Sequence, residues 1–168
     1  MYSVIKLILS LILIMSSFFV GNTFSVKLTN RRKTLSSILS AISRIKTLIC
    51  FGGVDTVRVV EECFCSSDFP LMNEDLLSSN SDYGKAFAEC VEKISRSFSL
   101  TKSDKELLTQ FGANLGSSDV TGQVAHAELY AELFSERLNL AKEQENTKSK
   151  LYRVLGFSLG CAISLLIV

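Results

Sequence analysis

The sequence predicts an all-α protein in which a helical bundle is flanked by N- and C-terminal transmembrane helices. Two observations predict it. Apolar residues are concentrated in the first twenty and the last eighteen of the 168 residues. Between these ends, apolar residues recur at steps of three and four, which is the period of a helix with one buried face. We therefore expect three segments: residues 1–25 as a membrane segment, residues 26–150 as a cytoplasmic helical domain, and residues 151–168 as a second membrane segment.

The C-terminal segment, residues 151–168, carries a single charge, Arg153, near its edge. At ~1.5 Å per residue it would span roughly 27 Å as a helix, close to the ~30 Å thickness of the hydrocarbon core of a bilayer. Gly156, Gly160 and Ser164 recur every four residues, a spacing typical of helices that pack closely in lipid. The sequence predicts a membrane anchor here. Its small residues either contact another helix or belong to a flexible apolar anchor without such a contact.

The N-terminal segment has Lys6 immediately before the apolar residues 7–20. It is either an uncleaved span or a secretory signal peptide. No small-x-small cleavage pattern follows it, which favours the span. Basic residues beside both apolar segments lie on the side of the middle domain, and the positive-inside rule then places that domain in the cytoplasm. These residues are Lys27, Arg31, Arg32, Lys33, Lys142, Lys148, Lys150 and Arg153.

The middle domain begins with a predicted helix whose apolar face ends at Gly52. Asp55 and Pro70 would start two shorter helices, and a further helix is expected from Tyr83. The face of the first helix consists of Leu35, Ile38, Leu39, Ile42, Ile45 and Ile49.

Two helix starts are predicted in the second half of the domain. Ser103 and Glu106 form a candidate capping box, and residues 117–119 open the last helix. The last helix carries an a/d seam that can continue without a break into the C-terminal segment. The seam consists of Val124, Ala127, Ala131, Phe134, Leu138 and Ala141.

The sequence lacks the residue patterns of an enzyme. Its one histidine, His126, has no nucleophile signature to act with, so we expect it to make packing or hydrogen-bond contacts. The five cysteines are odd in number, and Cys63 and Cys65 form a lone C-x-C pair, too few ligands for zinc. We predict reduced thiols, no catalytic residue, no cofactor, no metal and no nucleic acid, and a solvated face around Glu143 and Glu145.

One block is more specific than the rest, and it reads F-G-x-x-L-G-x-x-D-x-x-x-Q. It resembles the stage III sporulation protein AB family of endospore-forming bacteria, and the resemblance covers essentially the whole chain. An arginine-rich first helix that ends in Phe51-Gly52 agrees with it, as does Leu155-Gly156 near the C-terminus. The chain departs from the family pattern at Arg32, where a proline is usual, and at Phe87, where a tryptophan is frequent. The residues of the block are Phe111, Gly112, Leu115, Gly116, Asp119 and Gln123.

The resemblance implies a non-enzymatic platform subunit in the membrane complex between mother cell and forespore, with its main domain on the mother-cell side. It implies a helical domain similar to that of the F platform proteins of type II secretion. The implied partners are the stage III sporulation ATPase AA, the other membrane proteins of the complex and a second copy of the chain. The alternative is an exported receptor or envelope protein with a cleaved signal peptide and a C-terminal anchor.

The block itself has two interpretations. Gly112 and Gly116 would permit a tight corner between helices, and Asp119 would sit at the favourable N-terminus of the next helix. Either the block forms this corner only, or it also binds a partner.

Overall fold

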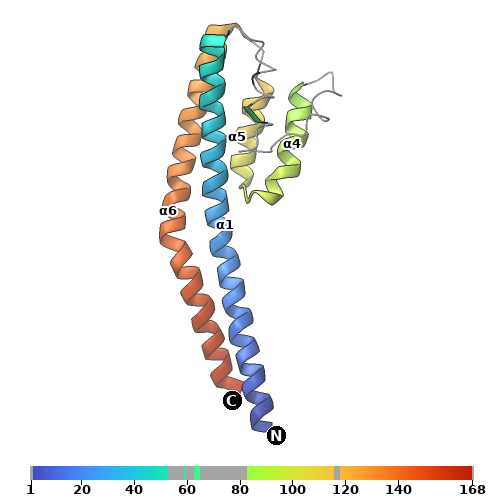
Figure 1. Ribbon diagram of the computed structural model, residues 1–168, viewed down its shortest axis with the longest axis vertical. Coiled ribbons are helices and arrows are strands. Elements are labelled where there is room, and N and C mark those ends of the chain that lie inside the picture. The colour runs from blue at the N-terminus through green and yellow to red at the C-terminus, as the bar shows by residue number, and fades with distance from the viewer. Residues whose placement is uncertain (1, 53–58, 60–62, 65–82, 116–117, 168) are drawn as a thin grey trace. The chain divides into compact units, whose positions relative to one another are not determined.

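All regular elements in the part of the chain that the structure describes are helices (Figure 1). This computed structural model describes residues 2–52, 59, 63–64, 83–115 and 118–167. Its helices are α1 (Tyr2–Gly52), α4 (Tyr83–Ser97), α5 (Lys102–Ala113) and α6 (Val120–Ile167). The all-α prediction is confirmed. The short helices predicted after Asp55 and Pro70 lie outside the described residues, apart from 59 and 63–64, which are helical.

The chain divides into two compact units. One, the helix-pair unit, consists of Met1–Arg32 and Leu140–Val168, and the other, the helical unit, consists of Lys33–Asn139. Both α1 and α6 contribute residues to each unit. The first predicted helix therefore continues N-terminally as far as Tyr2, and the last one extends to Ile167 without a break, as its seam predicted.

The helical unit has a core built around three neighbouring phenylalanine rings. Phe64 meets Phe87 edge to face, with ring centroids 5.7 Å apart, and Phe111 lies 6.3 Å from Phe64. The predicted apolar face of α1 packs into this core, since all of its members except the half-buried Leu39 are buried. The other fully buried large side chains in the described part of this unit are Leu35, Ile38, Ile42, Ile45, Val91, Leu108, Gln123 and Phe134.

Polar contacts connect the helices at the edge of this core. Thr34 Oγ1 on α1 donates to the carbonyl oxygen of Phe98, 3.2 Å away, just after α4. Lys46 Nζ on α1 lies 2.6 Å from Glu128 Oε1 on α6, and this hydrogen bond raises the pKa of Lys46. α1 is thereby held against both the end of α4 and the first half of α6.

The capping box of α5 differs from the predicted one. Thr101, not Ser103, is the N-cap, and its Oγ1 accepts the backbone N–H of Asp104 at 3.2 Å. The Asp104 carboxylate in turn accepts the N–H of Thr101 at 3.1 Å. Ser103 is already inside the helix, because the extended backbone ends at Thr101 and helical geometry begins at Lys102. Asp104 is fully buried, so this part of the box lies in the interior of the helical unit.

The helix-pair unit consists of the N-terminal part of α1 and the C-terminal part of α6, which run antiparallel (Figure 1). Contacts between residues 17 and 156, 25 and 149, and 31 and 144 fix this pairing along its length. Within the described residues, no helix combines the length and apolar character that a membrane crossing requires. The two transmembrane helices therefore stay predictions.

Candidate functional site

The corner between α5 and α6 contains the predicted block, and an aromatic stack forms its centre. The imidazole of His126 lies almost parallel to the ring of Phe111, with centroids 5.4 Å apart and an interplanar angle of 7°. His126 Nε2 is also 3.1 Å from the carbonyl oxygen of Phe111. The ring of Tyr130 contacts both of the others, with its centroid 4.6 Å from that of His126 and 5.4 Å from that of Phe111. The predicted packing and hydrogen-bonding role of His126 is confirmed.

Gly112 contributes to the corner in a different way from the one predicted. It lies inside α5, and a Cβ atom added there would collide with the ring of Phe87 on α4. The glycine is therefore required by the close packing of α4 on α5 rather than by a turn. Leu115 is half-buried, and its N–H donates to the carbonyl oxygen of Gly112 at 3.3 Å. Gly116 lies outside the described residues.

Asp119 and Gln123 are the polar members of the block at the start of α6. Asp119 Oδ1 accepts the N–H of Gly122 at 3.0 Å, so Asp119 caps α6 as its position in the sequence predicted. Gln123 is 2% exposed. Its Nε2 donates to Ser118 Oγ at 3.0 Å, whereas its Oε1 has no hydrogen-bond partner. A buried acceptor without a donor costs ~1–3 kcal/mol. The Oε1 atom of Gln123 is therefore an unsatisfied hydrogen-bond acceptor within the corner.

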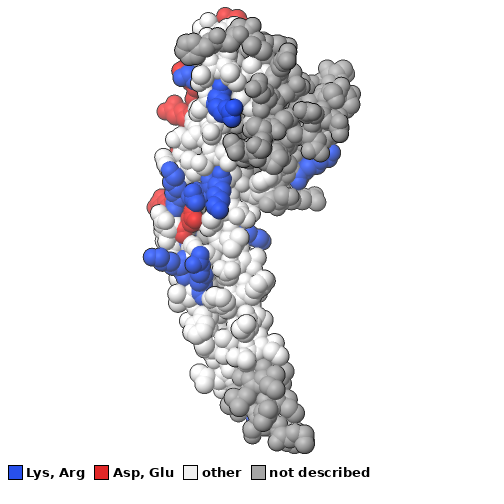
Figure 2. Space-filling view, viewed as in Figure 1, with Lys and Arg blue, Asp and Glu red and all other residues white. Residues whose placement is uncertain are grey.

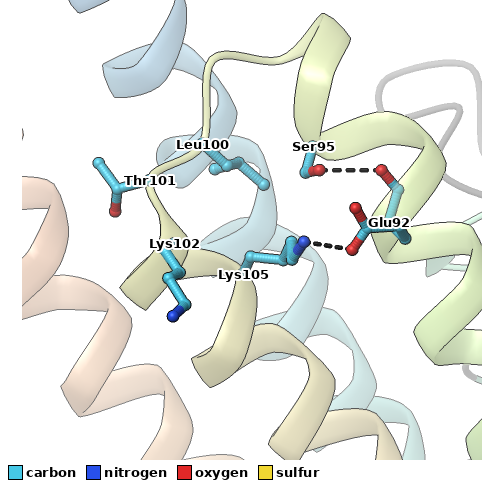
Figure 3. Close-up of a pocket in the computed structure, with 6 residues that line it drawn as sticks. All are labelled: Glu92, Ser95, Leu100, Thr101, Lys102 and Lys105. Carbon is cyan, nitrogen blue, oxygen red and sulfur yellow. Dashed lines mark hydrogen bonds and ion pairs between the residues drawn. The ribbon is translucent and has the colours of Figure 1, made fainter.

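A shallow pocket lies between α4 and α5 (Figure 3). Lys105 extends across it to the carboxylate of Glu92, and Ser95 Oγ donates to the backbone carbonyl of Glu92 at 2.9 Å. Lys102 lies 3.9 Å from Glu106. The cations that line this pocket are thus already balanced by carboxylates. None of the described residues forms a cluster that could hold a metal ion.

In the helix-pair unit, the small residues predicted in the C-terminal segment lie against α1. A Cβ atom added to Gly156 would lie 3.1 Å from Gly21 Cα and 2.9 Å from the carbonyl oxygen of Ser17. One added to Gly160 would lie 3.0 Å from Ile14 Cα, and Ser164 is buried. The two helix backbones are therefore in direct contact at Gly156 and Gly160, which is the geometry that small-residue spacing produces in lipid.

The α1 side of this contact was not predicted. A Cβ atom added to Gly21 would lie only 2.5 Å from the carbonyl oxygen of Tyr152. Ser17, Gly21 and Ser25 recur every four residues, as the small residues of the C-terminal segment do. The same four-residue spacing of small residues in both segments is the sequence signal that could have predicted this contact. It indicates that the two segments pack against each other as helices.

Hydroxyl and charged side chains connect the two helices of this unit, and we call them the polar ladder. Ser17 Oγ donates to the carbonyl oxygen of Gly156 at 2.7 Å. The hydroxyls of Ser25 and Ser149 are 2.5 Å apart, and Arg153 Nε donates to Ser25 Oγ at 3.1 Å. Every one of these groups has its partner within the helix pair.

The end of the polar ladder that is furthest from the chain termini corrects one prediction. Glu145 does not belong to a solvated face, because its side chain is only 20% exposed. Thr29 Oγ1 donates to Glu145 at 2.8 Å and Arg32 Nε at 2.5 Å. Arg31, 8% exposed, donates to Gln144 Oε1 at 2.8 Å. Two of the basic residues assigned to a membrane flank thus pair α1 with α6. Glu143 is exposed, as predicted.

Many large apolar side chains are exposed on the outer surface of the helix pair. Phe19 is 72% exposed and Leu165 81%, while the interior holds glycines and serines. In Figure 2, charged atoms give way to mostly white ones towards the chain ends. This distribution is the reverse of that in a water-soluble pair of helices, whose large apolar side chains are buried. The exposed large apolar residues of this unit include Leu11, Ile12, Met15, Phe18, Phe19, Val20, Phe24, Val26, Leu140, Leu151, Val154, Leu155, Phe157, Leu159, Ile163 and Leu165.

Comparison with known families matches nearly the whole chain. The family model for stage III sporulation protein AB matches residues 6–168. The chain belongs to this family. It is also similar to the stage III sporulation protein AB of Bacillus subtilis (strain 168), with 23% identity over 170 residues that cover 98% of this chain and 99% of that protein. No solved structure matches the chain.

Membership of the stage III sporulation protein AB family confirms the resemblance stated from the sequence and supports a role in sporulation. The family is described as a sporulation protein and not by a reaction. The similarity to F platform proteins and the absence of catalysis stay predictions.

Replacing Gln123 with leucine tests what this side chain does for the corner. Leucine has a similar size and removes the unpartnered Oε1, while Ser118 is exposed and can turn to water. We expect the free energy of unfolding, measured by denaturant titration, to stay within about 1 kcal/mol of the original or to rise. Gln110→Leu, at an exposed position of α5, is the control. A loss above about 2 kcal/mol would show that the amide stabilises the corner.

Replacing Gly156 with valine tests the backbone contact in the helix pair. The added atoms would press on Ser17 and Gly21 and separate the helices. In a cysteine-free chain carrying Ser25→Cys and Ser149→Cys, whose hydroxyls are 2.5 Å apart in the original, mild oxidation should form a disulfide efficiently. We expect Gly156→Val to lower the disulfide yield several-fold. Phe157→Val, at the exposed neighbouring position, should leave it unchanged, and equal yields would contradict the contact.

Proposed function

We propose that the chain is a non-enzymatic scaffold subunit of the stage III sporulation complex between mother cell and forespore. In this proposal the helix-pair unit is embedded in the cell membrane, and the helical unit lies in the mother-cell cytoplasm beside the stage III sporulation ATPase AA. The observation that carries the proposal is the inverted distribution of residues in the helix-pair unit, with small and hydroxyl side chains inside and large apolar ones outside.

A bilayer accounts for this distribution where water does not. In water, burial of apolar surface stabilises a protein by roughly 25 cal/mol for every Å² removed from solvent, and exposed apolar side chains do not contribute this free energy. In lipid there is no such penalty, and helices associate instead through close packing of small residues and interhelical hydrogen bonds. The Gly21–Gly156 contact and the Ser25–Ser149 hydrogen bond are interactions of these two kinds.

The distribution of charge supports the same orientation. Met1–Arg32 and Leu140–Val168 contain eight Lys and Arg residues and two glutamates, while Lys33–Asn139 contains ten Lys and Arg residues and fifteen acidic ones. In the sequence, most of the basic residues of the helix-pair unit lie between the apolar stretches and the helical unit. Basic residues next to a membrane segment favour the cytoplasmic side, so the helical unit would be cytoplasmic.

The helix pairing favours this proposal over an exported protein with a cleaved signal peptide. Cleavage after about twenty residues would remove Ser17 from α1, together with Ile14, which packs on Gly160. The C-terminal part of α6 would then lose its partner over most of its apolar stretch. An uncleaved α1 supplies that partner.

The orientation can be tested at Cys50, which is exposed on α1. Cys63 and Cys90 are poor probes because both are buried, and burial also raises the pKa of the Cys90 thiol. In a chain whose only cysteine is Cys50, we expect an impermeant maleimide to label permeabilised cells and not intact ones. Tyr2→Cys in a cysteine-free chain is the matched control, and it should be labelled in intact cells. Labelling of Cys50 in intact cells would place the helical unit outside.

The partnership is tested by capture from sporulating cells. Affinity purification of the tagged full chain from a mild detergent extract should recover the stage III sporulation ATPase AA together with other membrane proteins of the complex. An unrelated tagged membrane protein with a cytoplasmic domain is the control. Recovery of the membrane proteins without the ATPase, at both low and high salt, would contradict the ATPase partnership while leaving the scaffold role intact.

A further inference from the structure

Four exposed basic side chains lie at one level of the helix-pair unit, and we call them the basic collar: Lys27, Lys148, Lys150 and Arg153. Their level is fixed by the polar ladder. Ser25 and Ser149 meet at 2.5 Å, which places Lys27 two residues from the contact on α1 and Lys148 and Lys150 directly beside it on α6. Arg153 reaches back to the same two serines.

The basic collar has no carboxylate partner among the residues that the structure describes. The only acidic residues in the sequence of this unit are Glu143 and Glu145, and Glu145 is already engaged by Thr29 and Arg32. Arg153 uses Nε and Nη2 to contact serine hydroxyls, which carry no charge. The positive charge of the collar is therefore not neutralised within the unit.

Aromatic side chains lie at the same level. The rings of Phe24 and Tyr152 pack together with centroids 5.7 Å apart, and Lys27 Nζ lies 5.5 Å from the centroid of Phe24. Beyond them, towards the chain ends, the exposed side chains are mainly apolar. Aromatic rings next to cations, at the boundary of an apolar surface, are typical of the headgroup level of a membrane.

We propose that the basic collar binds the phosphate groups of anionic phospholipids. This inference rests on the proposed membrane location and adds the class of lipid that the unit prefers. Ammonium and guanidinium groups donate hydrogen bonds to phosphate oxygens, while the apolar face beside them contacts the acyl chains. A nucleic acid would match the charge but not the adjacent apolar surface.

The size of the effect follows from the number of cations. Each Lys or Arg close to an anionic membrane surface strengthens binding about five-fold at physiological ionic strength. Removal of three lysines should therefore weaken the preference for anionic lipid on the order of 100-fold. The preference should also fall as salt is added, because salt screens the attraction.

The experiment compares two kinds of vesicle. Purified full-length chain is diluted from detergent onto preformed vesicles of phosphatidylcholine alone, or of phosphatidylcholine with about a third phosphatidylglycerol, and the bound fraction is measured by flotation. The test variant carries Lys27→Gln, Lys148→Gln and Lys150→Gln, and it leaves Arg153 in its contacts with the serines. The matched control carries Arg44→Gln, Lys93→Gln and Lys102→Gln, at exposed positions of the helical unit. Circular dichroism confirms that all three proteins are equally helical.

We expect the original chain and the matched control to prefer the anionic vesicles, and the test variant to lose most of that preference while still binding both vesicle types. Equal binding of the original chain to both vesicle types would overturn the lipid preference and leave the membrane location standing. An unchanged preference in the test variant would overturn the assignment to the collar. Failure of the original chain to bind either vesicle would overturn the proposed membrane location itself. Binding of the original chain to single-stranded nucleic acid as tightly as to anionic vesicles would show that the collar does not select lipid.

Discussion

The close backbone contact between α1 and α6 at Gly21 and Gly156 is the constraint on which the helix-pair unit depends. An ideal Cβ atom would lie 2.5 Å from the Tyr152 carbonyl oxygen at Gly21 and 2.9 Å from the Ser17 carbonyl oxygen at Gly156, so neither position can carry a side chain at this separation. Short hydroxyl side chains can span the gap between helices only when the backbones are this near, and the Ser17–Gly156 and Ser25–Ser149 hydrogen bonds are examples. The large apolar residues then have no space inside, and they point outward.

The helical unit depends on a comparable close approach, but with an aromatic core. Gly112 lets the ring of Phe87 lie directly on α5, and this brings Phe87 and Phe111 into contact with Phe64. The stack of His126 on Phe111 then fixes the start of α6 against the end of α5. The F-G pair of the family block is therefore explained by packing. Gln123 is not, since one of its buried polar atoms is left without a partner.

Much of this could be predicted from the sequence, because apolar periodicity depends only on which residues face the core. The face of α1 from Leu35 to Ile49 and the continuous α6 follow from it. The cap at Asp119 follows from a different local rule, the preference for a carboxylate at a helix N-terminus. The sequence did not reveal contacts between residues that are far apart in the chain. Glu145 looked solvated because residues 142–150 are all polar, yet Arg32, more than a hundred residues away, lies against it. Thr101 was missed as the cap because Ser103 offered an equally acceptable side chain two residues later.

The polar ladder also explains how the two helices keep their register. An apolar pair of helices with small residues every four positions could slide by one turn and regain similar contacts, because Ser17, Gly21 and Ser25 repeat at the same interval. Such a slide would separate Arg31 from Gln144 and Arg32 from Glu145, so the nearly buried Arg31 would lose the Gln144 acceptor. A hydrogen bond to a charged group contributes ~1.5–3 kcal/mol, and the shifted register would restore the apolar contacts but not these bonds. The charged end of the unit therefore sets the alignment of its apolar end, and with it the common level at which the basic and aromatic side chains of both helices meet.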